Sequence, residues 1–296
     1  MTDRIGVTGA TGHLGGGAAR LLAAGGTPIR LIVRDPARVP DLPDAGPDVE
    51  VAVASYAEAA RLTEAFSGLS ALYLVSGEEA HDRLDQHRIA VRAAADAGVP
   101  RIVYTSFLGA SPDATFRLAR DHFHTERYLH DTGLPFVALR NSLYADVLPY
   151  FVADGVLAGP AADGRLAPVA RADVIEVSVA ALLDRDWDTT STLDLTGPTL
   201  MDLHEVAEDL TRMTGSPVRY HRQTRDEAYA SRAHLGAPGW LMDAWVSTYT
   251  AIARGEMAVV SDTVAQVTGH PSTAFRDHRR APELLRDARV AHLTGG

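Results

Sequence analysis

The sequence predicts an α/β fold, a doubly wound parallel sheet with a smaller C-terminal α/β region. A glycine-rich turn at residues 4–15 joins a short apolar run to an apolar helical stripe. Apolar runs then alternate with longer helical stretches as far as residue 140, which is typical of a Rossmann-like sheet with crossover helices. Beyond residue 140 the alternation decays. We therefore expect an NAD(P)-binding domain at residues 1–140 and a substrate-binding region at residues 141–296 that partly completes the sheet.

The glycine-rich turn is the first element. Residues 5–7 suit a buried strand, and a helix is expected from Leu14 onward. Gly9 permits a turn that side chains would block, Gly12 lets a phosphate approach the backbone, and Gly15 lets the helix pack closely on the strand. Backbone N–H groups at the helix start would then face the anion. The residues expected at the phosphates are Gly9, Thr11, Gly12, His13, Leu14 and Gly15.

The second strand, at residues 29–33, ends where this fold places the residue that recognises the adenosine ribose. An NAD-preferring protein has Asp or Glu there, whereas this chain has Arg34. A planar guanidinium pairs with a 2′-phosphate and stacks on adenine, so we expect NADPH. Asp35 as a ribose-binding acid, and Arg34 as a merely solvated strand end, are the alternatives.

The alternation continues in order along the chain. Strands are expected at residues 49–53, 71–75, 101–105 and 135–139, helices at 56–66, 81–97 and 114–131, and a Pro- and Asp-rich loop at 36–47. Ligands bind at the carboxyl ends of such strands. The glycine-rich turn, Arg34, Ser76, Phe107 and residues 141–144 all follow strands, so we expect them to share one cleft.

The C-terminal half is less regular. Residues 155–171 are rich in Gly, Pro and Ala and are expected to form a loop, and Asp173 is expected to cap a helix that ends near Leu183. A short strand is expected at residues 193–195, and Asp202 with Glu205 predicts a capping box for the next helix. Aromatic residues and methionines gather at residues 224–250, as a substrate wall or as ordinary core.

Composition excludes several mechanisms. The 296 residues include no cysteine and no lysine, which excludes a catalytic thiol, a Schiff base and a lysine that activates a tyrosine. The net charge of −10 argues against binding to nucleic acid or anionic membranes. Without a signal peptide or an apolar run long enough to span a membrane, a cytoplasmic protein that binds small molecules is expected. The sequence is compatible with a homodimer.

Four motifs carry a resemblance to a known family: residues 8–15 (TGATGHLG), 33–36 (VRDP), 104–106 (YTS), and Asn141 followed by Tyr144. With these, the chain resembles the NmrA-like branch of the short-chain dehydrogenases/reductases, in particular its bacterial NAD(P)H:quinone oxidoreductases and triphenylmethane reductase. The resemblance implies NADPH across the glycine-rich turn and Asn141 and Tyr144 near the nicotinamide. Where the quinone reductases have Ser-Glu-Asn after that tyrosine, this chain has Ala-Asp-Val at residues 145–147, which leaves the substrate open.

Ordinary members of the superfamily reduce ketones with a Tyr-x-x-x-Lys pair, and the equivalent positions here are Leu118 and His122. His122 is the candidate acid because it titrates near neutral pH, with a buried structural histidine as the alternative. Tyr144 is the second catalytic candidate. Phe107, Asn141 and Tyr144 are expected to contact a flat substrate, and Asn141 alternatively holds the carboxamide of nicotinamide. No metal site is expected, because His122 and His124 lie on different helix faces.

These residues indicate an NADPH-dependent reductase that transfers hydride to a quinone or a similar planar conjugated acceptor without a Tyr-Lys pair. Such an acceptor is already electrophilic, so correct placement in a dry slot is the main requirement. Two alternatives remain. One is a non-enzymatic regulator that senses NADP(H), and the other is a tailoring reductase or isomerase of a biosynthetic pathway.

Overall fold

The computed structural model describes residues 3–42, 48–184 and 190–278, and these fall into two compact units. Unit 1 contains the described parts of residues 1–106, 121–140 and 174–193. Unit 2 contains those of residues 107–120, 141–173 and 194–296. The expected boundary after residue 140 is one of the crossings, but the chain also crosses at 106, 120, 173 and 193. A single cut therefore does not describe the division.

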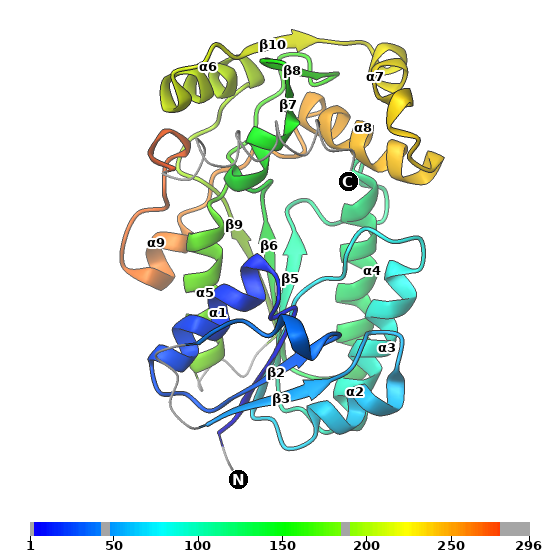
Figure 1. Cartoon of the computed structure of the whole chain (residues 1–296), viewed down its shortest axis with the longest axis vertical. Helices are drawn as coiled ribbons and strands as arrows, with labels where there is room; N and C mark the ends of the chain where they lie inside the picture. Colours follow the sequence, from blue (N-terminus) through cyan, green and yellow to red (C-terminus); the bar gives the residue numbers. More distant parts are fainter. Residues whose placement is uncertain (1–2, 43–47, 185–189, 279–296) are drawn as a thin grey trace. The chain divides into compact units, whose positions relative to one another are not determined.

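Seven strands of the described chain form one parallel sheet in the order β3-β2-β1-β4-β5-β6-β9 (Figure 1). The strands are β1 (Ile5–Thr8), β2 (Ile29–Val33), β3 (Val49–Val53), β4 (Ala71–Leu74), β5 (Ile102–Phe107), β6 (Phe136–Asn141) and β9 (Ser191–Leu195). The order reverses between β1 and β4, which is the point where such sheets bind their ligands. The predicted α/β, Rossmann-like fold class is confirmed.

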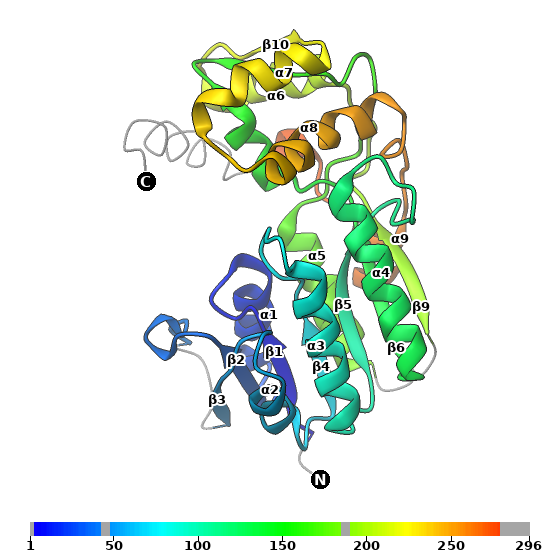
Figure 2. The same cartoon turned by 90° about the vertical axis from the view of Figure 1, so that its right-hand side faces the viewer.

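Helices cover both faces of this sheet (Figure 2). They are α1 (His13–Ala24), α2 (Ala59–Phe66), α3 (Arg83–Asp96), α4 (Arg117–Thr132) and α5 (Arg171–Leu183). Leu62 of α2, Val91 of α3 and Leu129 of α4 belong to one buried cluster with strand residues from one face. On the other face, Ile175 of α5 reaches so near Gly17 of α1 that a Cβ there would lie 2.3 Å from its Cδ1 atom. Two helical layers thus enclose the sheet.

The helix predicted from Tyr56 begins only at Ala59, because Tyr56 makes long-range contacts instead. Its hydroxyl lies 2.6 Å from both the Thr8 Oγ1 and the Val75 carbonyl oxygen. The loop predicted at residues 36–47 contains a short 3-10 helix at Pro36–Arg38, and residues 43–47 lie outside the described residues.

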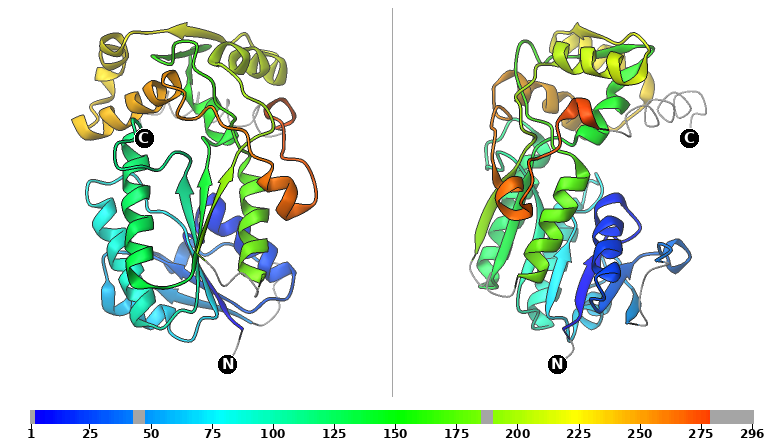
Figure 3. Two further views of the ribbon diagram at one scale, coloured as in Figure 1. Left: turned by 180° about the vertical axis from the view of Figure 1, so that it is seen from behind. Right: turned by 90° about the vertical axis from the view of Figure 1, so that its left-hand side faces the viewer.

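Unit 2 contains a three-stranded sheet of the order β10-β8-β7, with β10 parallel and β7 antiparallel to β8. Its elements are β7 (Val152–Ala153), β8 (Val156–Gly159), β10 (Arg219–Arg222), α6 (Leu203–Thr214), α7 (Arg225–Arg232), α8 (Gly239–Ala253) and α9 (Thr263–Thr268) (Figure 3). The loop predicted at residues 155–171 is wrong in its first part, which is β8. That strand pairs with β7 on one side and with the distant β10 on the other, and its composition rich in Gly and Ala gave no strand signal.

The two helix starts predicted in this half have different outcomes. The capping box of Asp202 and Glu205 is confirmed at the start of α6. Asp173 is not the cap of α5, which begins at Arg171. Its carboxylate instead accepts hydrogen bonds of 2.7 Å from the N–H and the hydroxyl of Thr273. Among the helices in the described ranges, none has the length and apolar character needed to cross a bilayer.

Candidate functional site

The glycine-rich turn has the conformation that its sequence predicts. Gly9 has φ +60°, a left-handed conformation in which a side chain is strained, and a Cβ there would lie 3.1 Å from the Cβ of Val75. The turn closes through a hydrogen bond of 2.9 Å from the Gly12 N–H to the Gly9 carbonyl oxygen. The chain therefore leaves β1 and enters α1 within a few residues.

Gly15 allows the helix to pack directly on the strand end. A Cβ at this position would lie 2.4 Å from the Gly9 carbonyl oxygen and 2.5 Å from that of Thr8. Both are backbone atoms that have no room to move, so the predicted reason for a glycine at this position is confirmed. The same approach leaves no room at Gly16, where a Cβ would lie 2.9 Å from the Ala10 carbonyl oxygen.

The first turn of α1 is open to an anion. Gly12 is the N-cap, with extended backbone and no side-chain capping bond, and no acidic residue lies in the first turn. Thr11, Gly12 and His13 are exposed, whereas the side chain of Leu14 is buried, so only its backbone lies toward the turn. An uncapped helix start with positive partial charge fits a diphosphate. These residues therefore fit the dinucleotide that the fold implies.

Arg34 follows β2 and is 61% exposed in its side chain. Its guanidinium forms an ion pair with Glu78, which follows β4. The two terminal nitrogens lie 2.5 and 3.5 Å from the two carboxylate oxygens. Asp35 caps the short helix that begins at Pro36 by accepting the N–H of Ala37 at 2.9 Å. The carboxylate of Asp35 is thus already used locally, and Arg34 keeps an exposed guanidinium.

Ser76 and Gly77 continue the edge of the sheet beyond β4, and side chains hold their backbone. The Ser76 N–H donates to Thr105 Oγ1 at 2.6 Å. The Gly77 N–H donates to His87 Nε2 at 2.8 Å, and the Gly77 carbonyl accepts from Arg83 Nε at 2.9 Å. The N–H and the carbonyl of Gly77 both bond to buried side chains, which hold this loop in place. We call the loop of Ser76 and Gly77 the platform after β4.

His122 lies in unit 1 and is buried, with 6% exposure. Its Nε2 lies 3.1 Å from a terminal nitrogen of Arg83, and its Nδ1 lies 2.9 Å from the Tyr104 hydroxyl. Burial, followed by the positive charge of Arg83, lowers the pKa of His122 well below its usual value. The ring is therefore neutral at physiological pH, which favours the structural alternative over that of an acid.

His87 is a second buried histidine in the same network. Its Nε2 accepts the Gly77 N–H, so its Nδ1 carries the proton and donates to Thr125 Oγ1 at 2.9 Å. Burial and the nearby Arg83 lower the pKa of His87 to about 3. Arg83 itself is 4% exposed and pairs with Asp121 at 3.2 Å. The network therefore carries one buried positive charge and two neutral rings.

Phe107, Asn141 and Tyr144 belong to unit 2. Asn141 is 1% exposed and donates from Nδ2 to the Tyr144 hydroxyl at 3.1 Å. Within the described part of the chain, the Oδ1 of Asn141 and the hydroxyl of Ser142 are buried without a hydrogen-bond partner. The ring of Phe107 packs on Phe116 at 4.7 Å between centroids. A ligand with a donor group would satisfy the carboxamide oxygen of Asn141.

The predicted site residues therefore form two groups. Those of the glycine-rich turn, Arg34, Ser76 and His122 belong to unit 1, and Phe107, Asn141 and Tyr144 belong to unit 2. Each group is well defined by its own contacts. The single cleft shared by all of them remains a prediction.

Asp146, within the segment that departs from the quinone reductases, is part of a polar cluster in unit 2. It accepts the Arg171 N–H at 2.9 Å and lies 3.1 Å from Nε2 of His278. Burial alone would raise its pKa, but the bonds from His278 and Arg171 outweigh it and hold the pKa below the usual value. The guanidinium of Arg171 also lies 5.3 Å from the ring centre of Tyr144.

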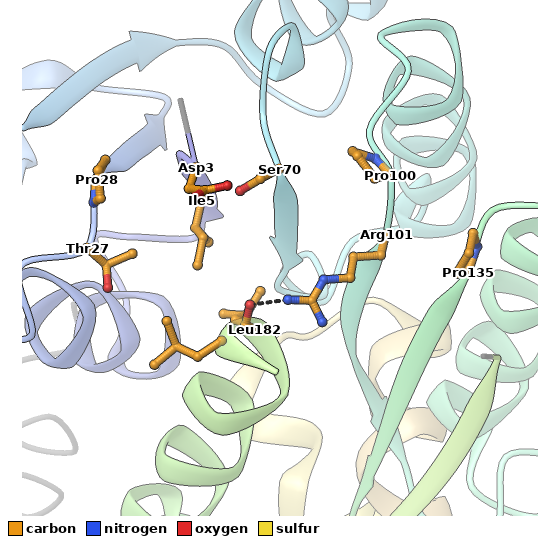
Figure 4. Close-up of a pocket in the computed structure, with 10 residues that line it drawn as sticks. Asp3, Ile5, Thr27, Pro28, Ser70, Pro100, Arg101, Pro135 and Leu182 are labelled. Atoms are coloured by element: carbon orange, nitrogen blue, oxygen red, sulfur yellow. Dashed lines mark hydrogen bonds between the residues drawn. The ribbon is translucent and has the colours of Figure 1, made fainter. Parts of the chain in front are cut away.

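A pocket of about 520 Å³ lies at the amino-terminal ends of the strands, opposite to the glycine-rich turn (Figure 4). Its lining includes Thr27, Pro100 and Pro135, which precede strands β2, β5 and β6. Arg101 also lines the pocket, and its guanidinium donates to the Leu182 carbonyl at the end of α5. Ligands of doubly wound sheets bind at the carboxyl ends of strands, so we do not assign the reaction to this pocket. Within the described residues, no group of three or more His, Asp or Glu could hold a metal ion.

Comparison with known families agrees with the geometry of unit 1. A family model described as NAD(P)H-binding matches residues 9–185, from the glycine-rich turn to the end of α5. The chain belongs to this NAD(P)H-binding family. The predicted NmrA-like relationship is confirmed by this match together with the relatives below.

Three matches to known proteins are informative, and two of them are to a quinone oxidoreductase of Escherichia coli. Quinone oxidoreductase 2 of Escherichia coli K12 is 32% identical over 279 residues, which are 92% of this chain and 96% of that protein. The structure of an NADPH-dependent quinone oxidoreductase of E. coli complexed with NADPH has a TM-score of 0.81 at 30% identity and covers 98% of this chain and 99% of its own. Citrobacter triphenylmethane reductase complexed with NADP(H) has a TM-score of 0.80 at 28% identity, with 96% and 99% covered.

Sequence reasoning missed several residues of the site. Arg83, His87 and Glu78 gave no local signal, because their partners are distant in the sequence. Charged residues such as Glu78 are visible after β4 in the sequence, but nothing local indicates what they contact. Asp146 was noted only as a departure from the family, and its contact with His278 was not predicted.

Proposed function

We propose that the protein is an NADPH-dependent reductase that transfers a hydride to a quinone or a similar planar conjugated acceptor. The observation that carries the proposal is the pairing, in unit 1, of an uncapped helix start built from glycine with an exposed Arg34 after β2. Membership of the NAD(P)H-binding family supports it. So do relatives that are named for quinone and triphenylmethane acceptors.

The cofactor-binding residues follow from the same geometry. In the proposal, backbone N–H groups of the glycine-rich turn bind the diphosphate, and the guanidinium of Arg34 binds the 2′-phosphate. Ser76 lies on the platform after β4, and Asn141 offers its unpartnered Oδ1 to a carboxamide. The proposed set is Gly9, Thr11, Gly12, His13, Leu14, Gly15, Arg34, Ser76 and Asn141. NADPH supplies the hydride when bound.

The proposed acceptor contacts are Phe107, Asn141 and Tyr144. The aromatic ring of Phe107 offers a face for a flat molecule, and the Tyr144 hydroxyl offers a polar contact for its carbonyl oxygen. Hydride transfer converts the quinone to a hydroquinone monoanion, and one further proton completes the hydroquinone while NADPH becomes NADP⁺. That oxyanion is a weak base, so solvent or the hydroxyl of Tyr144 suffices as the proton source.

We assign His122 a positioning role. Its two ring nitrogens already bond Arg83 and Tyr104, and Arg83 in turn holds the carbonyl of Gly77. The histidine thus helps to hold Arg83, and through Arg83 the carbonyl of Gly77, in place. His122 stands at the position of the superfamily lysine, but this role does not reproduce the chemistry of the Tyr-Lys pair.

The test is an absorbance assay at 340 nm. Purified protein is mixed with NADPH or NADH and with a simple benzoquinone or naphthoquinone, against controls that lack protein or quinone. We expect NADPH to be oxidised only when both the protein and the quinone are present, and NADH to be oxidised more slowly than NADPH. Calorimetric titration of NADPH into the protein gives binding separately from turnover.

The alternatives give different results in this design. Tight NADPH binding without oxidation by any quinone or dye would contradict the reductase and favour the NADP(H)-sensing regulator. Oxidation of NADPH by a different carbonyl or alkene acceptor, with no oxidation by quinones, would favour a tailoring reductase. Conversion of such a substrate without net NADPH loss would favour an isomerase.

A further inference from the structure

The ion pair between Arg34 and Glu78 joins the ends of two strands that flank β1. Arg34 follows β2, and Glu78 follows the platform formed by Ser76 and Gly77 after β4. Both terminal nitrogens of the arginine face both carboxylate oxygens, at 2.5 and 3.5 Å. The carboxylate therefore occupies the same two donors that a phosphate group would use.

This pair contributes little to the fold. The two side chains are 61% and 76% exposed, and ion pairs at such exposure are typically close to neutral for stability. Other contacts hold the backbone around Glu78. The residue just before it, Gly77, donates its N–H to His87 and accepts from Arg83 at its carbonyl, and these two side chains are 1% and 4% exposed. The buried network thus presents the carboxylate to Arg34, and an explanation other than stability is needed.

We propose that Glu78 is a specificity-determining residue that competes with the 2′-phosphate of NADPH for Arg34. The inference rests on the proposed function, since it concerns the cofactor site of that reaction. A 2′-phosphate carries up to two negative charges. To bind Arg34 it must either displace the negatively charged carboxylate of Glu78 or share the guanidinium with it. NADH has a hydroxyl at that position, which donates to a carboxylate instead of being repelled by it. Glu78 thereby reduces the preference for NADPH that Arg34 alone would impose.

The experiment compares Glu78→Gln with wild type by calorimetric titration. The probes are NADPH, NADH and adenosine 2′,5′-bisphosphate, which carries the distinguishing phosphate without the nicotinamide. We expect Glu78→Gln to bind NADPH and the bisphosphate about fivefold more tightly at low salt, and NADH less than about twofold differently. The gain should shrink in 0.5 M salt, roughly to less than twofold, because the interaction is screened.

Two further variants separate a local effect from a general one. Asp85→Asn removes one negative charge from the exposed first turn of α3 and should leave all affinities within about 1.5-fold. In an Arg34→Ala background, Glu78→Gln should no longer raise NADPH affinity, because the two residues act through each other. Circular dichroism checks that each variant is folded.

The outcomes distinguish this inference from the proposed function. Wild type that binds neither dinucleotide would overturn the proposed function itself. If wild type binds NADPH, but Glu78→Gln binds it no more tightly or Asp85→Asn gives the same gain, only the role of Glu78 is overturned. A gain from Glu78→Gln that persists without Arg34 would likewise contradict competition for that guanidinium.

Discussion

The Nε2 atom of His122 lies 3.1 Å from a terminal nitrogen of Arg83, and this contact determines where the proton of the ring resides. Arginine can only donate, so Nε2 is the acceptor, and Nδ1 carries the proton that it donates to the Tyr104 hydroxyl. The ring is a neutral link between helices α3 and α4 and strand β5. Four predictions concern this network and the cofactor site.

Removal of His122 should affect stability more than proton transfer. His122→Ala leaves a buried guanidinium N–H without its acceptor, so the free energy of unfolding should fall by about 2–4 kcal/mol in urea titrations. His122→Gln keeps a polar group for Arg83 and should lose only about half as much. The quinone reductase activity of folded His122→Gln should keep the wild-type pH profile. Near-normal stability with abolished turnover, or loss of one ionisation from that profile, would restore the catalytic role.

Acid should destabilise the protein through its buried histidines. The pKa of His87 is about 3 in the fold, against about 6.5 in an unfolded chain, so the unfolded state binds the additional proton. The stabilisation is complete above pH 6.5 and is lost as pH falls toward 3, by up to about 1.4 kcal/mol per pH unit. Urea titrations between pH 7 and 4 measure the slope. His87→Gln should make it shallower, whereas exposed His124→Gln should not; equal slopes in all three proteins would refute the assignment.

Gly15→Ala should disrupt the turn. The added methyl group would lie 2.4 Å from the Gly9 carbonyl oxygen, so α1 must move away from β1. We expect a loss of about 1–3 kcal/mol in stability and of at least about tenfold in NADPH affinity. Gly239→Ala is the matched control, since a Cβ there meets nothing within 4 Å at the start of α8. Wild-type affinity in folded Gly15→Ala would contradict the close packing.

Arg34→Glu should reverse the preference for the cofactor. Loss of a charge-assisted phosphate contact costs about 1.5–3 kcal/mol, which corresponds to roughly 10- to 150-fold in NADPH affinity, and the new carboxylate adds repulsion. NADH affinity should stay within a few-fold of wild type. Calorimetry with both dinucleotides measures the ratio. Unchanged NADPH affinity would show that another residue binds the 2′-phosphate.

Much of unit 1 was predictable because its signals are local. The runs at residues 29–33 and 49–53 form strands with the predicted bounds. The first is largely buried and nearly continuous in apolar residues, and the second is an edge strand whose valines alternate with other residues. Gly9 and Gly15 were also predictable: Gly9 has the positive φ that the turn needs, and Gly15 packs against backbone atoms of Thr8 and Gly9. Strand β8 was not, because it lies between the two-residue β7 and β10, and the β10 partner comes about 60 residues later in the chain.

By itself, the sequence determined the parallel sheet, the glycine-rich turn, the arginine after β2 and the absence of a Tyr-Lys pair. These depend on residue type and short-range spacing. Only the tertiary structure decided that His122 is buried and neutral, that Arg34 faces Glu78, and that Asp146 meets His278. Partners such as His122 with Arg83 and Arg34 with Glu78 are 39 and 44 residues apart, and packing of strands and helices is what brings them within hydrogen-bond distance. Burial and partner, rather than residue type, then set the charge that each side chain carries.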